Sequence, residues 1–95
     1  MADVKQEKAQ SIAIEVFTWL LGNDELLGIF MGASGASIDD LRARAAEPEF
    51  LGSVLDFVLM DDAWVVAVAD AHGWAYTDLM AARAGLPGGG EVHWT

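Results

Sequence analysis

The sequence predicts an all-α fold, a compact small bundle of five to six short helices forming a single domain over residues 1–95. Hydrophobic residues make up 54% of the 95 positions, and a chain of this length buries about 60 to 65% of the surface it exposes when unfolded. Apolar residues recur at intervals of three and four, which is the spacing of one helical face. Glycine, proline and short polar residues separate these segments, so short loops and steep helix crossings are expected.

The segment 48–73 is the most apolar and is predicted to supply the centre of the core. One helical face is expected to consist of Leu51, Val54, Leu55 and Val58, which follow the i, i+3, i+4, i+7 spacing. Asp61 divides the segment because its short side chain can accept the first N–H groups of a new helix. We therefore predict a central helix from Pro48 to Met60 and a second helix that ends at Gly73.

A membrane span is excluded by the charges in the same segment. Residues 50–69 would suffice for about 30 Å of hydrocarbon. However, Asp56, Asp61 and Asp62 lie near the middle, and each carboxylate there costs about 3 kcal/mol to insert. No membrane association is predicted.

Four further helices follow from periodicity and caps. The first runs from Val4 to Leu21 and is predicted to end at Gly22 in the left-handed conformation. A flexible loop is expected at 32–37, between the second and third helices. The second helix is predicted from Asp24 to Met31, with Asn23 as its N-cap. The third is predicted from Ile38 to Ala46, with Ser37 as its N-cap, and the last from Asp78 to Ala84, with Thr77 as its N-cap.

The charge balance excludes some partners. The net charge is -10, with 15 acidic residues against 5 basic ones; direct nucleic-acid binding is not expected, because phosphate backbones are bound by clustered Lys and Arg. Acidic residues also repel anionic membranes. They serve either solubility or steering toward a basic partner. The first ten residues lack the pattern of a secretory signal, so a cytoplasmic protein is expected.

No catalytic constellation is evident, and we predict neither an enzyme nor a cofactor. The chain has no cysteine, which excludes disulfides and thiolate zinc sites. The serines lack a nucleophile-elbow pattern. His72 and His93 are the only histidines and do not form a His-x-x-x-His pair. An alternative is a small-ligand or metal-binding protein using Asp62, Asp70, His72 and His93, provided that the fold brings these residues together.

The leading hypothesis is a non-enzymatic adaptor or regulatory module that binds another protein or itself. The glycine-rich tail, residues 86–95, places large side chains beyond three consecutive glycines. These side chains either fold back onto the bundle or offer an extended peptide to another protein. The predicted interaction surface consists of Trp74, Tyr76, Val92, His93 and Trp94.

The chain also resembles a family of short, uncharacterised alphaproteobacterial proteins grouped as a domain of unknown function. The resemblance implies a small bacterial cytoplasmic helical domain, and it brings no activity, ligand or site residue. It spans nearly the whole chain and rests on Trp19-Leu20-Leu21-Gly22-Asn23-Asp24-Glu25-Leu26, Gly32-Ala33-Ser34-Gly35, Asp39-Asp40-Leu41-Arg42, Phe50-Leu51-x-x-Val54-Leu55-Asp56-Phe57, Asp61-Asp62-Ala63-Trp64-Val65, Leu86-Pro87-Gly88-Gly89 and His93-Trp94-Thr95.

We expect Trp94 to close the domain by packing near Trp74 and Tyr76. Burial of a large apolar side chain stabilises a fold by about 2 to 3 kcal/mol, so Trp94→Ala should lower the melting temperature in a thermal unfolding experiment. An unchanged melting temperature would show that the Trp94 side chain does not pack on the bundle.

Overall fold

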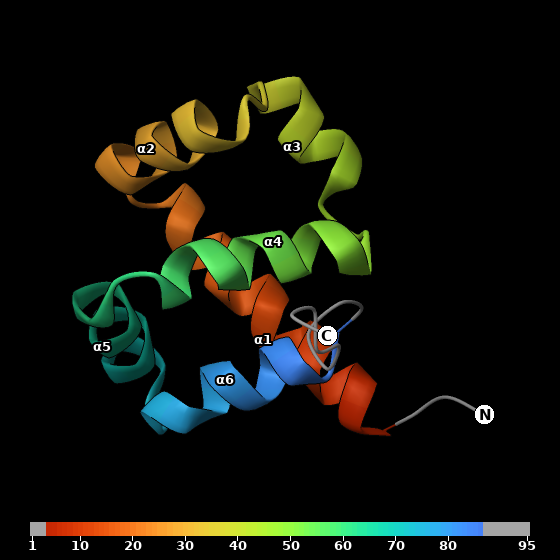
Figure 1. The fold of residues 1–95 in the computed structure, drawn as a ribbon, viewed down its shortest axis with the longest axis vertical. Helices are drawn as coiled ribbons and strands as arrows, with labels where there is room; N and C mark the ends of the chain where they lie inside the picture. Colours follow the sequence, from red (N-terminus) through yellow and green to blue (C-terminus); the bar gives the residue numbers. More distant parts are fainter. Residues whose placement is uncertain (1–3, 87–95) are drawn as a thin grey trace, which may run out of the picture.

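The structure is a computed structural model that describes the backbone of residues 4–86 and the side chains of residues 6–86. Over this range the chain folds into six α-helices. The predicted all-α fold is confirmed (Figure 1). The helices, in chain order, are α1 (Val4–Leu21), α2 (Asp24–Ser34), α3 (Ile38–Arg44), α4 (Pro48–Leu59), α5 (Asp62–His72) and α6 (Tyr76–Ala84). Residues 86–95, the predicted tail, lie outside the described residues except for Leu86, which is buried.

The helix α4 lies across the middle of the bundle and is covered from several directions. The long helix α1 packs against α4 and α6, while α4 also contacts α5 and α6. In Figure 1 the pair α2 and α3 lies on one side of α4, and α5 and α6 lie on the other. This arrangement explains why α4 carries apolar residues around most of its circumference.

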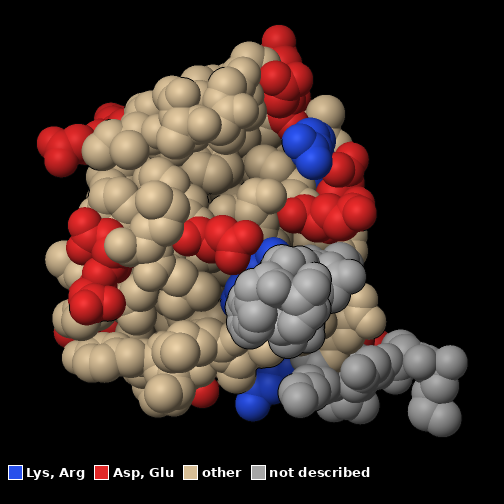
Figure 2. Space-filling model, viewed as in Figure 1, with Lys and Arg blue, Asp and Glu red and all other residues tan. Residues whose placement is uncertain are grey.

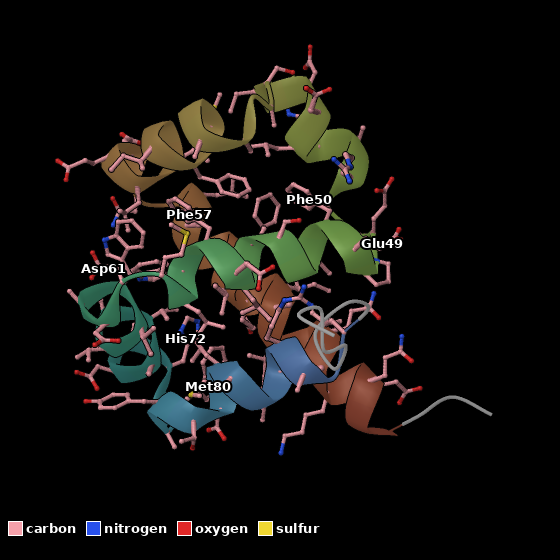
Figure 3. All side chains as sticks on the ribbon, in the orientation of Figure 1. Glu49, Phe50, Phe57, Asp61, His72 and Met80 are labelled. Carbon is pink, nitrogen blue, oxygen red and sulfur yellow. The ribbon has the colours of Figure 1, made fainter. Side chains whose placement is uncertain are left out.

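The predicted apolar face of α4 is confirmed by burial. Leu51, Val54, Leu55 and Val58 are completely buried. Phe50 and Phe57 are also buried, on the side of α4 that faces α2 and α3 (Figure 3). Two separate faces of α4 therefore contribute to the core.

A continuous chain of aromatic contacts fixes three other helices to α4. Phe17 of α1 meets Phe50 edge to face, with 5.3 Å between ring centroids. Phe30 of α2 packs between the two α4 rings, 6.1 Å from Phe50 and 5.2 Å from Phe57. Trp64 of α5 then stacks on Phe57 at 4.8 Å. Edge-to-face and offset-stacked geometries are the favourable ones for aromatic pairs.

Most of the predicted N-caps are formed. The Asn23 side chain accepts a hydrogen bond from the Leu26 N–H at 3.3 Å. Ser37 and Asp40 form a capping box: the Ser37 hydroxyl accepts from the Asp40 N–H, and the Asp40 carboxylate accepts from the Ser37 N–H. Hydrogen bonding to the Ser37 backbone, and secondly to the Ser37 side chain, lowers the pKa of the Asp40 carboxyl group below its ordinary value. These caps are local interactions, which is why short sequence patterns reveal them.

Several helix ends differ from the prediction. The helix α2 continues to Ser34, through part of the expected loop, and Gly35 at φ 75° closes it. Left-handed glycines among the described residues are Gly35 and Gly73, so the prediction for Gly22 is wrong. The N–H groups of Gly22 and Asn23 instead bond to the Trp19 and Leu20 carbonyls, and this tightened last turn requires no left-handed residue.

Two further helices end slightly earlier than predicted. The helix α3 ends at Arg44 instead of Ala46, and α4 ends at Leu59 instead of Met60. Such differences of one or two residues are common at helix ends, where the last turn frays or tightens.

A bidentate ion pair joins α6 to α4. Arg83 donates from Nε to Oδ1 of Asp56 at 2.7 Å and from Nη2 to Oδ2 at 3.1 Å. Its guanidinium group crosses α4 over Gly52, where an added Cβ atom would lie 2.9 Å from Nη1. A residue with a Cβ atom at this position would require the Arg83 side chain to shift.

The predicted break in the apolar segment 48–73 is present, because α4 ends before Met60 and Asp61 and α5 begins after them. None of the helices in the described range is long and apolar enough to cross a membrane.

We expect Phe50→Ala to lower the free energy of unfolding by about 3 to 5 kcal/mol, the usual cost of removing a buried aromatic ring. The substitution removes the contacts with Phe17 and Phe30 and the cation–π contact with Arg44, whose Cζ lies 5.4 Å from the ring centroid. Urea unfolding measures the change, with Ile14→Ala as a control at a side chain that is 43% exposed. Equal effects of the two substitutions would show that the aromatic chain does not hold the bundle together.

Candidate functional site

An apolar groove lies between α5 and α6 and is the best candidate for a functional site. Its volume is about 530 Å³, and it is open to solvent along one side. The lining residues, which define the α5–α6 groove, are Leu59, Asp62, Val65, Val66, Tyr76, Thr77 and Met80.

Two caps fix the direction of α5 and so one wall of the groove. The Asp61 carboxylate accepts a hydrogen bond from the Ala63 N–H at 2.8 Å, which confirms the predicted N-cap. At the other end Gly73 adopts φ 71°, and the Trp74 N–H bonds back to the Ala69 carbonyl at 2.9 Å. The chain therefore reverses sharply after α5, and α6 returns alongside it.

The start of α6 differs from the prediction of a helix over 78–84 with Thr77 as its cap. The helix begins at Tyr76, and Thr77 lies inside its first turn. Asp78 explains the difference, because its carboxylate reaches back and accepts a hydrogen bond from the Ala75 N–H at 3.0 Å. The two extra residues place Tyr76 and Thr77 on a helix wall of the groove.

Both walls expose one side of a helix whose other side is buried. On α5 the buried residues are Val65, Val68 and Ala69, and on α6 they are Leu79 and Ala82. The outer faces carry Val66, Tyr76 and Met80, with exposed fractions of 37%, 50% and 60%. Solvent-exposed apolar side chains that lie together mark interaction surfaces more often than isolated ones do.

On each of the two helices, a pair of residues that line the groove lies four positions apart. Asp62 and Val66 are four positions apart on α5, and Tyr76 and Met80 are four positions apart on α6. Residues at this spacing lie on the same helical face. Met80 is labelled in Figure 3, where it lies on α6 beside α5.

Sequence reasoning missed the Met80 side of the groove. Leu79 and Met80 are adjacent apolar residues of the last helix; Leu79 is fully buried, whereas Met80 is exposed. The spacing Tyr76 to Met80 was the available signal for a second apolar face. It could not be recognised because the expected helix began after Tyr76.

The structure separates two members of the predicted interaction surface. Tyr76 lines the α5–α6 groove. Trp74 is partly buried against the core and stacks on His72 with ring centroids 4.3 Å apart. The other predicted members, Val92, His93 and Trp94, lie outside the described residues.

Three of the residues proposed for metal binding, Asp62, Asp70 and His72, lie in the described part of the chain and do not converge. Asp62 and Asp70 lie eight positions apart on α5, an axial separation of about 12 Å. Asp70 accepts a long hydrogen bond of 3.4 Å from the Tyr76 hydroxyl, and His72 Nδ1 donates to the Val68 carbonyl at 2.9 Å. Over residues 6–86 no three His, Asp or Glu side chains form a group that could hold a metal ion. The metal-binding alternative is therefore not favoured, and His93 lies outside the described residues.

A second apolar hollow lies on the opposite part of the bundle. It measures about 380 Å³ and is formed by α1, α2 and α3, with Phe17, Leu21, Leu27, Ile38, Leu41, Arg42 and Ala45 as its lining. It is smaller than the α5–α6 groove and has an arginine at its edge. The charged residue in its lining is therefore Arg42, whereas that of the α5–α6 groove is Asp62.

Fold and surface together define a small, six-helix domain with an apolar groove at its C-terminal helices and with no metal-binding cluster in the described part. The chain belongs to the family described as "Protein of unknown function (DUF3572)", whose model matches residues 6–89. This match confirms the resemblance to a family of unknown function. Neither the curated proteins nor the solved structures contain a match.

We expect Met80→Gln to leave the free energy of unfolding within about 0.5 kcal/mol of the unaltered protein, because surface changes are usually this small. Leu79→Ala should cost about 2 to 5 kcal/mol, since Leu79 is completely buried. Urea unfolding of the two variants measures the difference. A large loss in Met80→Gln would show that Met80 is a core residue and that the α5–α6 groove is not an exposed surface.

Proposed function

We propose that this protein is a non-enzymatic interaction module that binds a segment of another protein in the α5–α6 groove. The observation that carries the proposal is the exposure of Val66, Tyr76 and Met80 around one groove in a domain of this size. Three partly exposed apolar side chains on two rigid helices form a surface whose burial by a partner is favourable.

The chemistry of the groove favours a protein over a small molecule. Small-ligand sites usually combine an apolar cavity with several polar groups that converge on the ligand. The polar groups at this groove are the Asp62 carboxylate, the Thr77 hydroxyl and the Tyr76 hydroxyl, and the last of these is directed to Asp70. A mostly aliphatic, open surface is better suited to the apolar side chains of a peptide segment.

Charge favours another protein over a second copy of this chain. Two copies, each with a net charge of -10, repel one another at low ionic strength. An interface between the two acidic groove surfaces would bring like charges together, and such contacts are unfavourable. The partner is accordingly expected to be a different protein.

The proposal is tested with a photo-cross-linking amino acid placed at Met80 in the full chain, in cells of the source organism. Met60 is the matched control, because it is a methionine that is 79% exposed and does not line the groove. We expect one protein, identified by mass spectrometry, to be cross-linked from position 80 and not from position 60.

The purified partner should then bind the unaltered chain at least tenfold more tightly than the double variant Val66→Thr/Met80→Gln, which keeps side-chain size and charge. Equal cross-linking from both positions, cross-links between copies of this chain alone, or equal binding by the double variant would each refute the proposal.

A further inference from the structure

We propose that the occupant of the α5–α6 groove is an amphipathic helix whose apolar face is flanked by lysine or arginine. The inference rests on the proposed function and adds the chemical class of the partner. It follows from the form of the groove and from the charges beside it.

The form of the groove favours a helical occupant over an extended one. An extended peptide usually adds a strand to a sheet edge, and residues 4–86 contain no strand. Proline-rich segments bind between several aromatic side chains, whereas the aromatic residue in this lining is Tyr76. A helix instead offers apolar side chains at i, i+3, i+4 and i+7 to an aliphatic groove, and the flexible thioether of Met80 can adjust to them.

The charged residues on the two groove walls are acidic up to Ala82, whereas Lys8 of α1 lies beside Asp78, Ala81 and Ala82 in a separate hollow. Between positions 61 and 82 the charged residues are Asp61, Asp62, Asp70 and Asp78, and this stretch has no Lys or Arg. In Figure 2 acidic side chains gather over α5, and the Lys and Arg visible on this face lie away from α5, with one of them at the lower edge beside α6. The nearest arginine in the chain, Arg83, is bound to Asp56 of α4.

Asp62 is the acidic residue best placed to meet a partner. It lines the groove and is exposed, and over the described range no side chain forms a hydrogen bond or an ion pair with it. Asp61 is occupied as the cap of α5, and Asp78 bonds to the Ala75 N–H. A lysine or arginine on the partner helix can therefore pair with Asp62 while the apolar face covers Val66 and Met80.

The helix α3 of a second copy does not supply such a basic face. The exposed arginines on α3 are Arg42 and Arg44, but the same seven-residue helix begins with Asp39 and Asp40, and Arg44 pairs with Glu47 at 3.1 Å. The helix α3 is thus not basic along its face.

Two synthetic helical peptides test the inference on the full-length protein. Both carry Leu at i, i+3, i+4 and i+7; the flanking positions are Lys in one peptide and Glu in the other. Dissociation constants are measured by fluorescence anisotropy at low and high salt. We expect the Lys peptide to bind at least tenfold more tightly than the Glu peptide at low salt, and this ratio to fall at high salt because charges are screened.

Matched variants locate the binding site. Met80→Gln should weaken binding of the Lys peptide about tenfold because an apolar contact is lost, while Met60→Gln should leave it unchanged. Asp62→Asn should weaken binding about two- to fivefold, the range for one exposed ion pair. Asp39→Asn, which removes an exposed acid from the first turn of α3, is its control and should have no effect.

Equal binding of the two peptides, absence of binding by both, or equal effects within either pair of variants would overturn the inference. Its failure is distinguishable from failure of the proposed function. If a protein cross-links from position 80 but binds through a neutral or acidic segment, the docking groove remains and the basic-helix assignment is wrong. If the Lys peptide binds in the groove but no protein cross-links there, the interaction-module proposal is the one that fails.

Discussion

The need to cover α4 on nearly every side is the constraint on which the rest of the structure depends. One face carries the completely buried Leu51, Val54, Leu55 and Val58, and another carries Phe50 and Phe57. A helix with two apolar faces is stable in water only when other helices cover both. The aromatic contacts from Phe17 to Trp64 meet that requirement on the α2 side and tie α1, α2 and α5 to α4.

The same constraint explains why an apolar groove remains at α5 and α6. Those helices use Val65, Val68, Leu79 and Ala82 to cover the core, but each also has apolar residues outside that face. Because the chain reverses tightly at Gly73, the two outer faces come together as the walls of one groove. The apolar content, which is high for a small domain, is thus divided between the core and an exposed groove.

Local interactions account for the parts of the fold that could be predicted from sequence. The caps at Asn23, Ser37 and Asp61 depend on residues within three positions of one another. Two helix ends differ from the prediction because another nearby residue forms the end. The Asp78 carboxylate accepts a hydrogen bond from the Ala75 N–H, so α6 begins earlier, and Gly35 ends α2 in place of Gly32, so α2 ends later. Of the candidate surface, Tyr76 was predicted, whereas Val66, Met80 and the outward position of Asp62 became evident only once α5 and α6 were placed side by side.

By itself, the sequence determined the all-α class, the apolar centre at 48–60, the break at Asp61 and the acidic balance, since periodicity, caps and net charge are properties of neighbouring residues or of composition. Only the tertiary structure decided which apolar residues remain in water. Leu79 and Met80 are adjacent and both hydrophobic, yet one is fully buried and the other is 60% exposed. That choice depends on how α6 packs against α1 and α4. Contacts between helices that are distant in the chain decide which of two adjacent hydrophobic residues is covered, and hydrophobicity alone does not distinguish the two.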